Sequence, residues 1–342
     1  MTRDSSGLKK DTMRAIVIAR PGGPEVLELR DVPLPELGAG EVRVRVRACG
    51  LNRADMLQRM GAYPAPPDVP ADIPGLEFAG EIDAVGRGVV DFREGDRVFG
   101  LSGGGAYAEA VRVHARTLAR IPDGMPFDVA AAIPEAFITA YDAVVVQGGL
   151  DAGDTLLVHA VGSGVGTAAV QIAKAVGADV IGTARSQAKL ERARELGLTH
   201  GIVPEVQGAS VRFADAVRAN TRGRGADVVL ELVGGGYVSE SLASMAERGR
   251  LLLVGLLSGT RAEVDLAQLL RRRHHVIGTQ LRARPLEEKI AAGQHLDRRL
   301  GPLFAKGVLR PIVDRVLPLE KAEEAHVAMT ENANFGKIVL TT

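Results

Sequence analysis

The chain has 342 residues, in which 42 Lys and Arg balance 42 Asp and Glu, and hydrophobic residues make up 46%. This hydrophobic share excludes a largely disordered chain, and the length suggests roughly two domains. The balanced charge gives no sign of binding to nucleic acid or to an anionic membrane. The single cysteine, Cys49, excludes a disulfide framework within the chain and a Cys-rich structural zinc lobe.

The first 12 residues are polar and lack the apolar core of a signal peptide, so we expect a disordered tail. No apolar run in the sequence looks long enough to span a bilayer. One cysteine fits a reducing compartment. We therefore expect a cytoplasmic protein with no membrane partner.

The first part of the chain predicts short antiparallel strands. Residues 13–19 form a candidate first strand, and a second follows the PGG turn at residues 21–23. In residues 41–48 valine alternates strictly with arginine, which predicts a half-buried strand with the arginines toward solvent. Further strands at 75–85 and around 98–99, separated by Gly/Pro turns, predict a mostly antiparallel, barrel-like domain.

Residues 52–60 predict a short helix capped by Asn52, which Gly61 ends. A Pro-rich stretch continues to Pro74 without a periodic pattern. Irregular loops of this length usually carry function, so we expect part of the site here.

Helical periodicity in residues 130–146 marks a domain junction, after which strands and helices alternate. This alternation predicts an α/β fold with a doubly wound parallel sheet, and with the ligand at the carboxyl ends of the strands. Candidate strands cover 155–160, 179–183, 201–203, 227–233, 251–254 and 276–278. We expect one domain in residues 133–281 and the other in residues 13–132 and 282–342, to which the final strand FGKIVLTT returns.

Residues 155–190 read as strand, glycine turn, helix and strand. Gly162, Ser163, Gly164 and Gly166 allow a sharp turn that exposes backbone N–H groups beneath a helix, where an anion is favoured. The strict G-x-G-x-x-G dinucleotide pattern is not met in either frame. A generic strand–helix turn is the alternative explanation.

The loop after the second strand of this unit contains Arg185, Ser186 and Lys189 and no acidic residue. An acid is the usual partner of the NADH ribose, whereas hydroxyl and basic groups bind a ribose phosphate. The loop therefore favours NADPH over NADH. The alternative is that Arg185 and Lys189 only form a solvated loop and helix start.

Several strings together resemble the medium-chain dehydrogenase/reductase superfamily over residues 13–340, and within it the zinc-free NADPH:quinone oxidoreductases of the tumour-suppressor-induced type. They are RPGGPE at 20–25, LNRADMLQRMGAY at 51–63, IPGLEFAG at 73–80, AAIPEAFITAY at 131–141, SGVGTAAVQIAK at 163–174 and FGKIVL at 335–340. The resemblance implies a Rossmann domain joined to a GroES-like catalytic domain, and a homodimer through the sheet edge near Val276.

The resemblance also implies cofactor contacts at matching positions. Ser163, Gly164 and Val165, in the turn that includes Gly162, would line the pyrophosphate, and Thr183, Ser186 and Lys189 would surround the ribose phosphate. The nicotinamide half would meet Val233, Gly234, Gly255 and Thr139, the last at a helix start. Asn52, Tyr63, Phe335 and Lys337 would complete the cleft. Pro204 stands where related reductases often place a tyrosine beside the adenine phosphate, which weakens the NADPH prediction.

The zinc-dependent branch of that superfamily has a cysteine ligand where Asn52 stands and a histidine ligand where Leu76 stands. Neither side chain is a strong zinc ligand, so we predict no catalytic zinc. A stoichiometric, activity-linked zinc in elemental analysis would overturn this prediction.

Without a metal, the reaction must depend on positioning of the cofactor and substrate. A quinone is already electrophilic, and we expect Tyr63 and Asn52 to act at its oxygen. The leading hypothesis is hydride transfer from NADPH to ortho- or para-quinones. Two alternatives remain: an enone or enoyl-thioester reductase, and a crystallin-like or RNA-binding relative that binds the cofactor with little turnover.

Overall fold

The structure is a computed structural model that describes residues 11–208 and 210–342. The chain divides into two compact units, unit 1 with residues 1–138 and 281–342 and unit 2 with residues 139–280. The first division lies six residues after the expected boundary (138 against 132), and the second one residue before it (281 against 282). Of the expected tail, residues 1–10 lie outside the described residues, and Thr12 already begins a strand.

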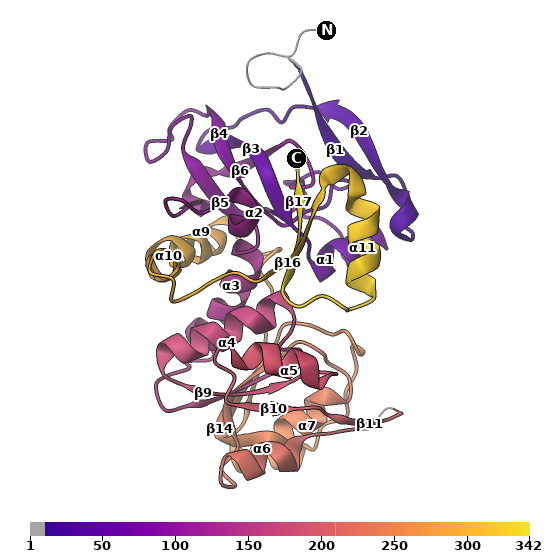
Figure 1. Cartoon of the computed structure of the whole chain (residues 1–342), viewed down its shortest axis with the longest axis vertical. Helices are drawn as coiled ribbons and strands as arrows, with labels where there is room; N and C mark the ends of the chain where they lie inside the picture. Colours follow the sequence, from indigo (N-terminus) through magenta and orange to yellow (C-terminus); the bar gives the residue numbers. More distant parts are fainter. Residues whose placement is uncertain (1–10, 209) are drawn as a thin grey trace. The chain divides into compact units, whose positions relative to one another are not determined.

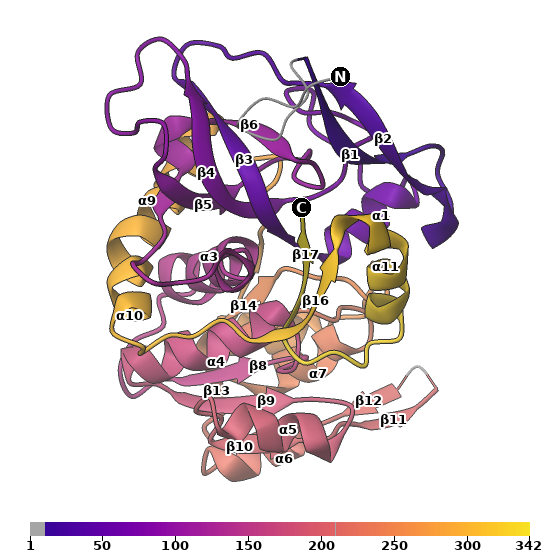
Figure 2. The same cartoon turned by 45° about the horizontal axis from the view of Figure 1, so that its top comes forward.

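Unit 1 is built mainly from antiparallel strands (Figures 1 and 2). Seven strands form one sheet in the order β16-β17-β3-β4-β5-β7, with β6 also pairing with β3, while β1 and β2 form a separate hairpin. Their bounds are β1 Thr12–Ile18, β2 Leu27–Pro33, β3 Glu41–Gly50, β4 Glu77–Val85, β5 Arg97–Leu101, β6 Ala110–His114, β7 Ala119–Arg120, β16 Val313–Pro318 and β17 Lys337–Thr341.

Strand β3 shows how the sequence pattern produces this sheet. Its valines are buried, and its arginines point to the other face, where Arg43 pairs with Asp83 of β4 at 2.8 Å and Arg47 pairs with Glu81 at 2.7 Å. The alternation therefore places apolar side chains in the core, as predicted, and carboxylates of β4 pair with Arg43 and Arg47 on the other face.

The helices of unit 1 include three that the sequence analysis did not identify. They are α9, α10 and α11, the last of which packs its alanines and Met329 into the same core as β3 and β4. The bounds are α1 Arg53–Arg59, α2 Phe127–Ala130, α3 Pro134–Tyr141, α9 Leu286–His295, α10 Gly301–Ala305 and α11 Ala322–Thr330. Helix α3 contains the division between the units, and a π-helical segment, Asp142–Gln147, continues it.

Unit 2 is a six-stranded parallel sheet with helices between the strands, as predicted. The order β10-β9-β8-β13-β14-β15 reverses direction between β8 and β13, which is where doubly wound sheets bind ligands. The strands are β8 Thr155–Val158, β9 Asp179–Thr183, β10 His200–Ile202, β13 Ala226–Glu231, β14 Met245–Leu253 and β15 His275–Gly278, and β11 Glu205–Gln207 pairs with β12 Ser210–Arg212 in a separate hairpin.

The helices of unit 2 follow the strands. They are α4 Gly164–Val176, α5 Gln187–Arg194, α6 Ala214–Asn220, α7 Tyr237–Ser244 and α8 Leu266–Arg272. Helix α4 begins at Ser163, whose hydroxyl caps it, and ends at Gly177 in a left-handed conformation. Figure 1 shows α6 and α7 side by side, in agreement with their contacts.

The expectation that no run of the chain could span a membrane needs correction. The helical stretch Phe127–Gln147 is 21 residues long and apolar enough to cross one. However, 72% of its most apolar window is buried inside the protein, which is the pattern of a core helix. No other helix of the described residues meets the same criterion.

Candidate functional site

Three side chains meet at one end of the sheet of unit 1. The ammonium group of Lys337 lies 2.5 Å from Oε1 of Glu77 and donates to Oδ1 of Asn52 at 2.6 Å and to the Leu51 carbonyl at 2.6 Å. Asn52 donates its amide to Oε1 of Glu77 at 2.9 Å. Glu77 is fully buried and Lys337 is 4% exposed. The buried ammonium group thus has three acceptors, and the buried carboxylate has donors from both Lys337 and Asn52, so the cost of burying these charges is offset.

The strand register brings these residues together. Lys337 opens β17, Glu77 opens β4 and Gly50 closes β3, and β3 pairs with both other strands. A Cβ atom on Gly50 would overlap the Glu77 carboxylate, so this glycine allows the close approach. The chain separation of 260 residues between Glu77 and Lys337 (337 − 77) is thus closed by sheet pairing.

Asn52 occupies the N-cap position of α1, as predicted, and Oδ2 of Asp55 accepts from the Asn52 backbone N–H at 2.8 Å. The other donors on Asp55 are the Gly75 N–H at 3.1 Å and the Tyr107 hydroxyl at 3.3 Å. Burial raises the pKa of Asp55 to about 6, although the N–H groups of Asn52 and Gly75 and the charge of Lys337 act to lower it. Asp55 therefore connects the N-cap residue Asn52 to Gly75 and to the buried Tyr107.

A buried polar chain continues from Tyr107. Its hydroxyl lies 3.4 Å from Nε2 of His326, and Nδ1 of His326 lies 3.1 Å from Nη1 of Arg59. Because an arginine can only donate, Nδ1 accepts and Nε2 carries the proton. Burial, with the charge of Arg59, lowers the pKa of His326 to about 3, so the ring is neutral. Arg59 also donates to the Gly22 carbonyl, which links this chain to the first loop.

Tyr63, in the Pro-rich loop, lies beneath Arg282. The Arg282 guanidinium carbon is 5.0 Å from the centre of the Tyr63 ring, and the same group donates to the Tyr63 carbonyl at 3.2 Å. Arg282 is 6% exposed and also donates to the Gly103 carbonyl and to Gln58 Oε1, each at 2.6 Å. A cation over an aromatic face is attractive, so Arg282 orders the loop and presents Tyr63.

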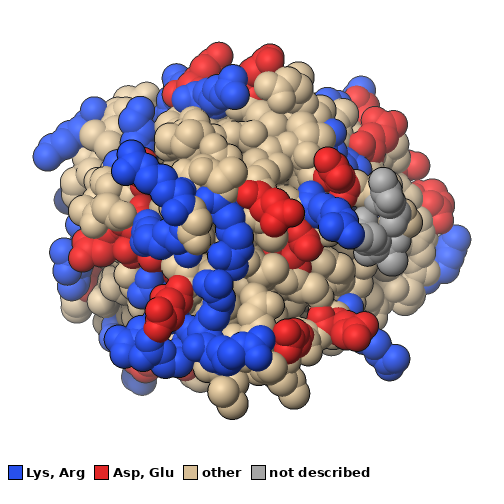
Figure 3. All heavy atoms as spheres, turned by 90° about the horizontal axis from the view of Figure 1, so that it is seen from below, with Lys and Arg blue, Asp and Glu red and all other residues tan. Residues whose placement is uncertain are grey.

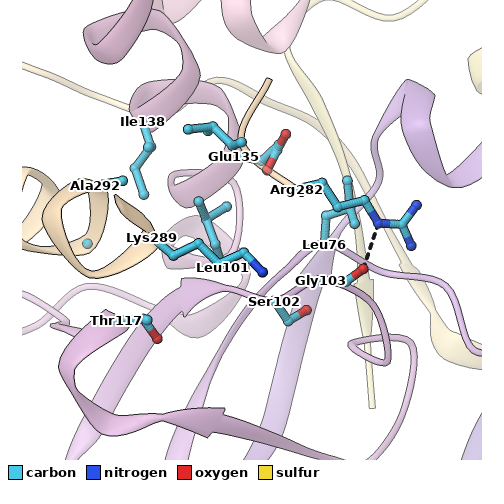
Figure 4. A pocket seen from close by; sticks show the side chains of 12 residues that line it. Leu76, Leu101, Ser102, Gly103, Thr117, Glu135, Ile138, Arg282, Lys289 and Ala292 are labelled. Atoms are coloured by element: carbon cyan, nitrogen blue, oxygen red, sulfur yellow. Dashed lines mark hydrogen bonds between the residues drawn. The ribbon is translucent and has the colours of Figure 1, made fainter. Parts of the chain in front are cut away.

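A pocket opens beside this cluster (Figure 4). Its lining is mainly apolar, with Glu135 and Arg282 among the few charged groups. The lining residues are Leu76, Leu101, Ser102, Gly103, Thr117, Glu135, Ile138, Leu281, Arg282, Lys289, Ala292 and Gly293. An apolar hollow with few polar groups is typical of small-molecule sites.

The two positions that differ from the zinc-dependent branch are both in this region. Asn52 is engaged with Glu77 and Lys337, and Leu76 lines the pocket. Among the described residues, no group of three or more His, Cys, Asp and Glu side chains is placed to hold a metal ion. Cys49 is buried, and burial raises the pKa of its thiol well above the ordinary value. The absence of a catalytic zinc stays a prediction.

The glycine turn of unit 2 suits a phosphate group. Ser163 accepts the Gly166 N–H at 3.0 Å through its hydroxyl, and the first N–H groups of α4, at Gly164 and Val165, have no carbonyl partner within the helix. Gly162 is buried beneath them, and a Cβ atom on Gly166 would overlap the Ala160 carbonyl. The turn is therefore tight and presents an anion site at a helix N-terminus, which fits a dinucleotide.

A second buried network supports the loops around this turn. His159, directly after β8, lies 2.9 Å from the hydroxyls of both Thr183 and Ser241, and Ser241 donates to Oε2 of Glu231 at 2.8 Å. Burial lowers the pKa of His159, so the ring is neutral and bonds both hydroxyls. We expected Thr183 near the ribose phosphate. Its hydroxyl is instead bonded to His159, and the whole residue is only 1% exposed.

Glu231 fixes the loop that we expected beside the nicotinamide. Its Oε1 accepts the Val233 N–H at 2.8 Å and the Gly234 N–H at 2.9 Å. Gly234 has a left-handed conformation, and a Cβ atom on Gly255 would contact the Leu232 carbonyl. These close approaches are between backbone segments of the protein, so the packing of the loops after β13 and β14 itself requires glycine at both positions. A contact of Val233, Gly234 and Gly255 with the nicotinamide stays a prediction.

The loop after β9 is placed as the sequence predicts. Ser186 is exposed at the start of α5, Lys189 is half-buried one turn later, and Arg185 is exposed. Pro204 precedes β11 and is buried. Tyr237 on α7 lies near Arg185: burial and Glu231 raise its pKa, and the charge of Arg185 lowers it.

Three further predicted residues have positions that the sequence did not reveal. Thr139 is in the second turn of α3 and not at its start, because the helix begins at Pro134. Phe335 is 2% exposed, and its N–H donates to Asp314 Oδ1 at 3.0 Å. All three donors of the Lys337 ammonium are used by Glu77, Asn52 and Leu51. Their contacts with a cofactor stay predictions.

Both halves of the chain match family models. Residues 38–123 match the alcohol dehydrogenase GroES-like domain, and residues 164–293 match the zinc-binding dehydrogenase family. Together with the two folds described above, these matches define a nicotinamide-dependent oxidoreductase of the alcohol dehydrogenase type.

The chain belongs to the medium-chain dehydrogenase/reductase superfamily, in its quinone oxidoreductase branch. It is 32% identical to the human quinone oxidoreductase, over 96% of this chain and 97% of that protein. It is 34% identical to the human synaptic vesicle membrane protein VAT-1 homolog, over 96% of this chain and 86% of that protein. The expected family and fold class are thereby confirmed.

Two solved structures differ in the cofactor that they name. A mycobacterial protein solved in complex with NADPH has a TM-score of 0.85 and 30% identity, with 96% of this chain and 100% of that chain covered. An NAD-dependent alcohol dehydrogenase has a TM-score of 0.83 and 36% identity, with the same coverage of both chains. The fold therefore supports a nicotinamide cofactor in either form.

Several residues of these sites were missed in the sequence. Glu77 and Glu135 stand inside the strings IPGLEFAG and AAIPEAFITAY, so the charged letter in an apolar run was the available signal. His159 and Glu231 had a comparable signal, because each is a polar residue in the second half of a predicted strand, 155–160 or 227–233. Arg282 lies beyond the last predicted strand of the parallel sheet, 276–278, and had no such signal. Their partners come from distant segments and had no signal in the sequence.

Proposed function

We propose that the protein is an NADPH-dependent quinone oxidoreductase that works without a metal. The observation that carries the proposal is the site of unit 1, where Lys337 supplies the buried cation and Asn52 and Leu76 replace metal ligands. Such a site has no Lewis acid of its own, so it suits a substrate that is already electrophilic. Quinones meet this requirement, and the apolar pocket beside Leu76 suits their rings.

The roles of the residues follow from their positions. The turn at Ser163 and the N-terminus of α4 would hold the pyrophosphate, and Ser186 and Lys189 would hold the ribose phosphate. The bound cofactor supplies a hydride. Tyr63 would bond or stack on the quinone, and Arg282 holds Tyr63 in place. Asn52, whose amide hydrogens bond Gly50 and Glu77, would keep Lys337 in position.

The proposal also covers the location of the enzyme, its oligomeric state and its partners. We infer a cytoplasmic protein that acts on a small molecule. A homodimer would form through β15, which is at one end of the sheet order and carries the half-exposed Val276. On the face in Figure 3, a band of Lys and Arg is accompanied by Asp and Glu side chains, and such mixed charge favours no nucleic-acid partner.

The cofactor preference can be tested by fluorescence titration with NADPH and NADH. We expect a Kd for NADPH at least tenfold lower, about 1.4 kcal/mol, because Lys189 and Ser186 would bind the extra phosphate. Lys189→Ala should remove most of this preference and leave the Kd for NADH unchanged. Lys174→Ala is the matched control, because Lys174 is exposed in the last turn of α4, away from the glycine turn at the start of that helix. Equal affinities in the wild type would contradict the proposal.

An enone or enoyl-thioester reductase is the nearest alternative, because Glu135 in the lining of the pocket, or Tyr63 near Glu135, could also protonate a reduced alkene. Oxidation of NADPH should be compared with 1,2-naphthoquinone and with a crotonyl thioester. We expect kcat/KM to be at least tenfold higher for the quinone, since it needs no activation of a carbonyl. The reverse order would assign the protein to thioester reduction. Binding of RNA that NADPH displaces, without turnover of either substrate, would support the low-turnover alternative.

Tyr63 is expected to stabilise the transition state of quinone reduction. Tyr63→Ala should lower kcat/KM at least tenfold, about 1.4 kcal/mol, because it removes both the ring and the hydroxyl. Tyr63→Phe keeps the ring beneath Arg282, so it separates a hydrogen bond from stacking. The Kd for NADPH, measured in parallel, should change little. If kcat/KM of Tyr63→Ala equals that of the wild type, Tyr63 has no role in the reaction.

A further inference from the structure

We propose that Glu135 is the proton donor of the reaction, giving the proton of its neutral carboxyl group to the substrate oxygen in the pocket. This inference rests on the proposed function and deepens it. Neither the family matches nor the sequence pattern assigned a role to this residue.

Glu135 stands in the lining of the pocket. It is the second residue of α3, is half-buried, and lines the pocket with the apolar side chains of Leu76 and Ile138. In Figure 4 its carboxyl group lies between Ile138 on one side and Leu76 and Arg282 on the other. A ligand in the pocket would therefore meet this carboxyl group.

The neighbouring carboxyl groups of Glu77 and Glu135 differ in their partners. Glu77 binds the Lys337 ammonium and the Asn52 amide, and its Oε2 accepts the backbone N–H of Glu135 at 2.8 Å. Within the described part of the chain, the carboxyl oxygens of Glu135 have no hydrogen bond or ion pair. Lys337 is already saturated by Glu77, Asn52 and Leu51, so it has no donor left for Glu135. The Glu135 carboxyl group is thus left for a ligand.

The carboxyl group of Glu135 is mainly protonated at neutral pH. Burial, followed by the charge of Glu77, raises the pKa of Glu135 to about 8, so the acid outnumbers the carboxylate by about ten to one at pH 7. Asp55 acts in the same direction, whereas Lys337 and Arg282 oppose it. The titratable and charged groups facing Glu135 are Glu77 of β4, Asp55 of α1, Tyr63 of the Pro-rich loop, Arg282 before α9, Lys289 of α9 and Lys337 of β17.

The proton balance of the step is simple. When the substrate accepts a hydride and its electron pair, negative charge develops on the conjugated oxygen. The O–H bond of Glu135 breaks, a new O–H bond forms on that oxygen, and Glu135 is left as a carboxylate. Solvent reaching the half-buried group returns the proton before the next turnover. General acids of this kind contribute about 10²- to 10⁴-fold.

The kinetic test compares Glu135→Gln with Glu287→Gln, the same change on the exposed surface of α9. We expect kcat of Glu135→Gln with a quinone to fall at least tenfold at pH 7, while the Kd for NADPH is unchanged. In the wild type and in Glu287→Gln, kcat should fall about tenfold per pH unit above about pH 8, because the acid is lost. In Glu135→Gln this break should disappear.

A readout independent of turnover uses infrared difference spectra of the cofactor-free protein. The wild type should show a carboxylic-acid C=O band that titrates near pH 8, which Glu287→Gln keeps and Glu135→Gln lacks. A wild type without this band, or a Glu135→Gln variant that keeps the band or the kinetic break, would overturn the inference alone. A wild type that oxidises NADPH with no quinone or enone would overturn the proposed function as well.

Discussion

The buried ion pair between Lys337 and Glu77 determines how the site of unit 1 is built. Removing a cation from water is costly unless its partners are complete, and here three acceptors surround the ammonium. Glu77 then bonds both Asn52 at the start of α1 and the N–H of Glu135 at the start of α3. One ion pair thus sets the start of two helices and one side of the pocket.

In unit 2 a buried carboxylate also holds the backbone in place, here through hydrogen bonds to neutral groups. Glu231 bonds the backbone of the loop after β13, and its partner Ser241 connects to His159 and Thr183 at the ends of β8 and β9. Buried polar groups are costly when unsatisfied, so a complete network has one stable arrangement. The loops that would hold the cofactor are therefore fixed before it binds. Both units place their rigid polar groups beneath the surfaces that a ligand would touch.

The parts of the fold that depend on local pattern could be predicted from the sequence. The valine–arginine alternation predicted β3, the glycine turn and apolar spacing predicted α4, and apolar runs predicted all six strands of the parallel sheet. Helices α9, α10 and α11 and the β11–β12 hairpin were not predicted. Their patterns are short and mixed, and packing against distant strands decides their structure.

The candidate site shows the same division. Asn52, Tyr63 and Lys337 were named from strings, but the ion pair of Lys337 with Glu77 depends on the register of β17, β3 and β4. Lys337 was expected to contact the cofactor, which stays a prediction, and the partners of its ammonium group within the protein were not expected. The protonation of Glu135 depends on Glu77 and on burial, which no local pattern contains.

The most direct measurement is the free energy of unfolding, from urea denaturation, of Lys337→Met, Glu77→Gln and the double variant. If the ion pair holds the site together, Lys337→Met should lose about 3–5 kcal/mol because Glu77 is left buried without its cation. The double variant should regain a large part of that loss, since neither charge remains. A Lys337→Met protein as stable as the wild type, or a double variant whose loss equals the sum of the single losses, would contradict this account.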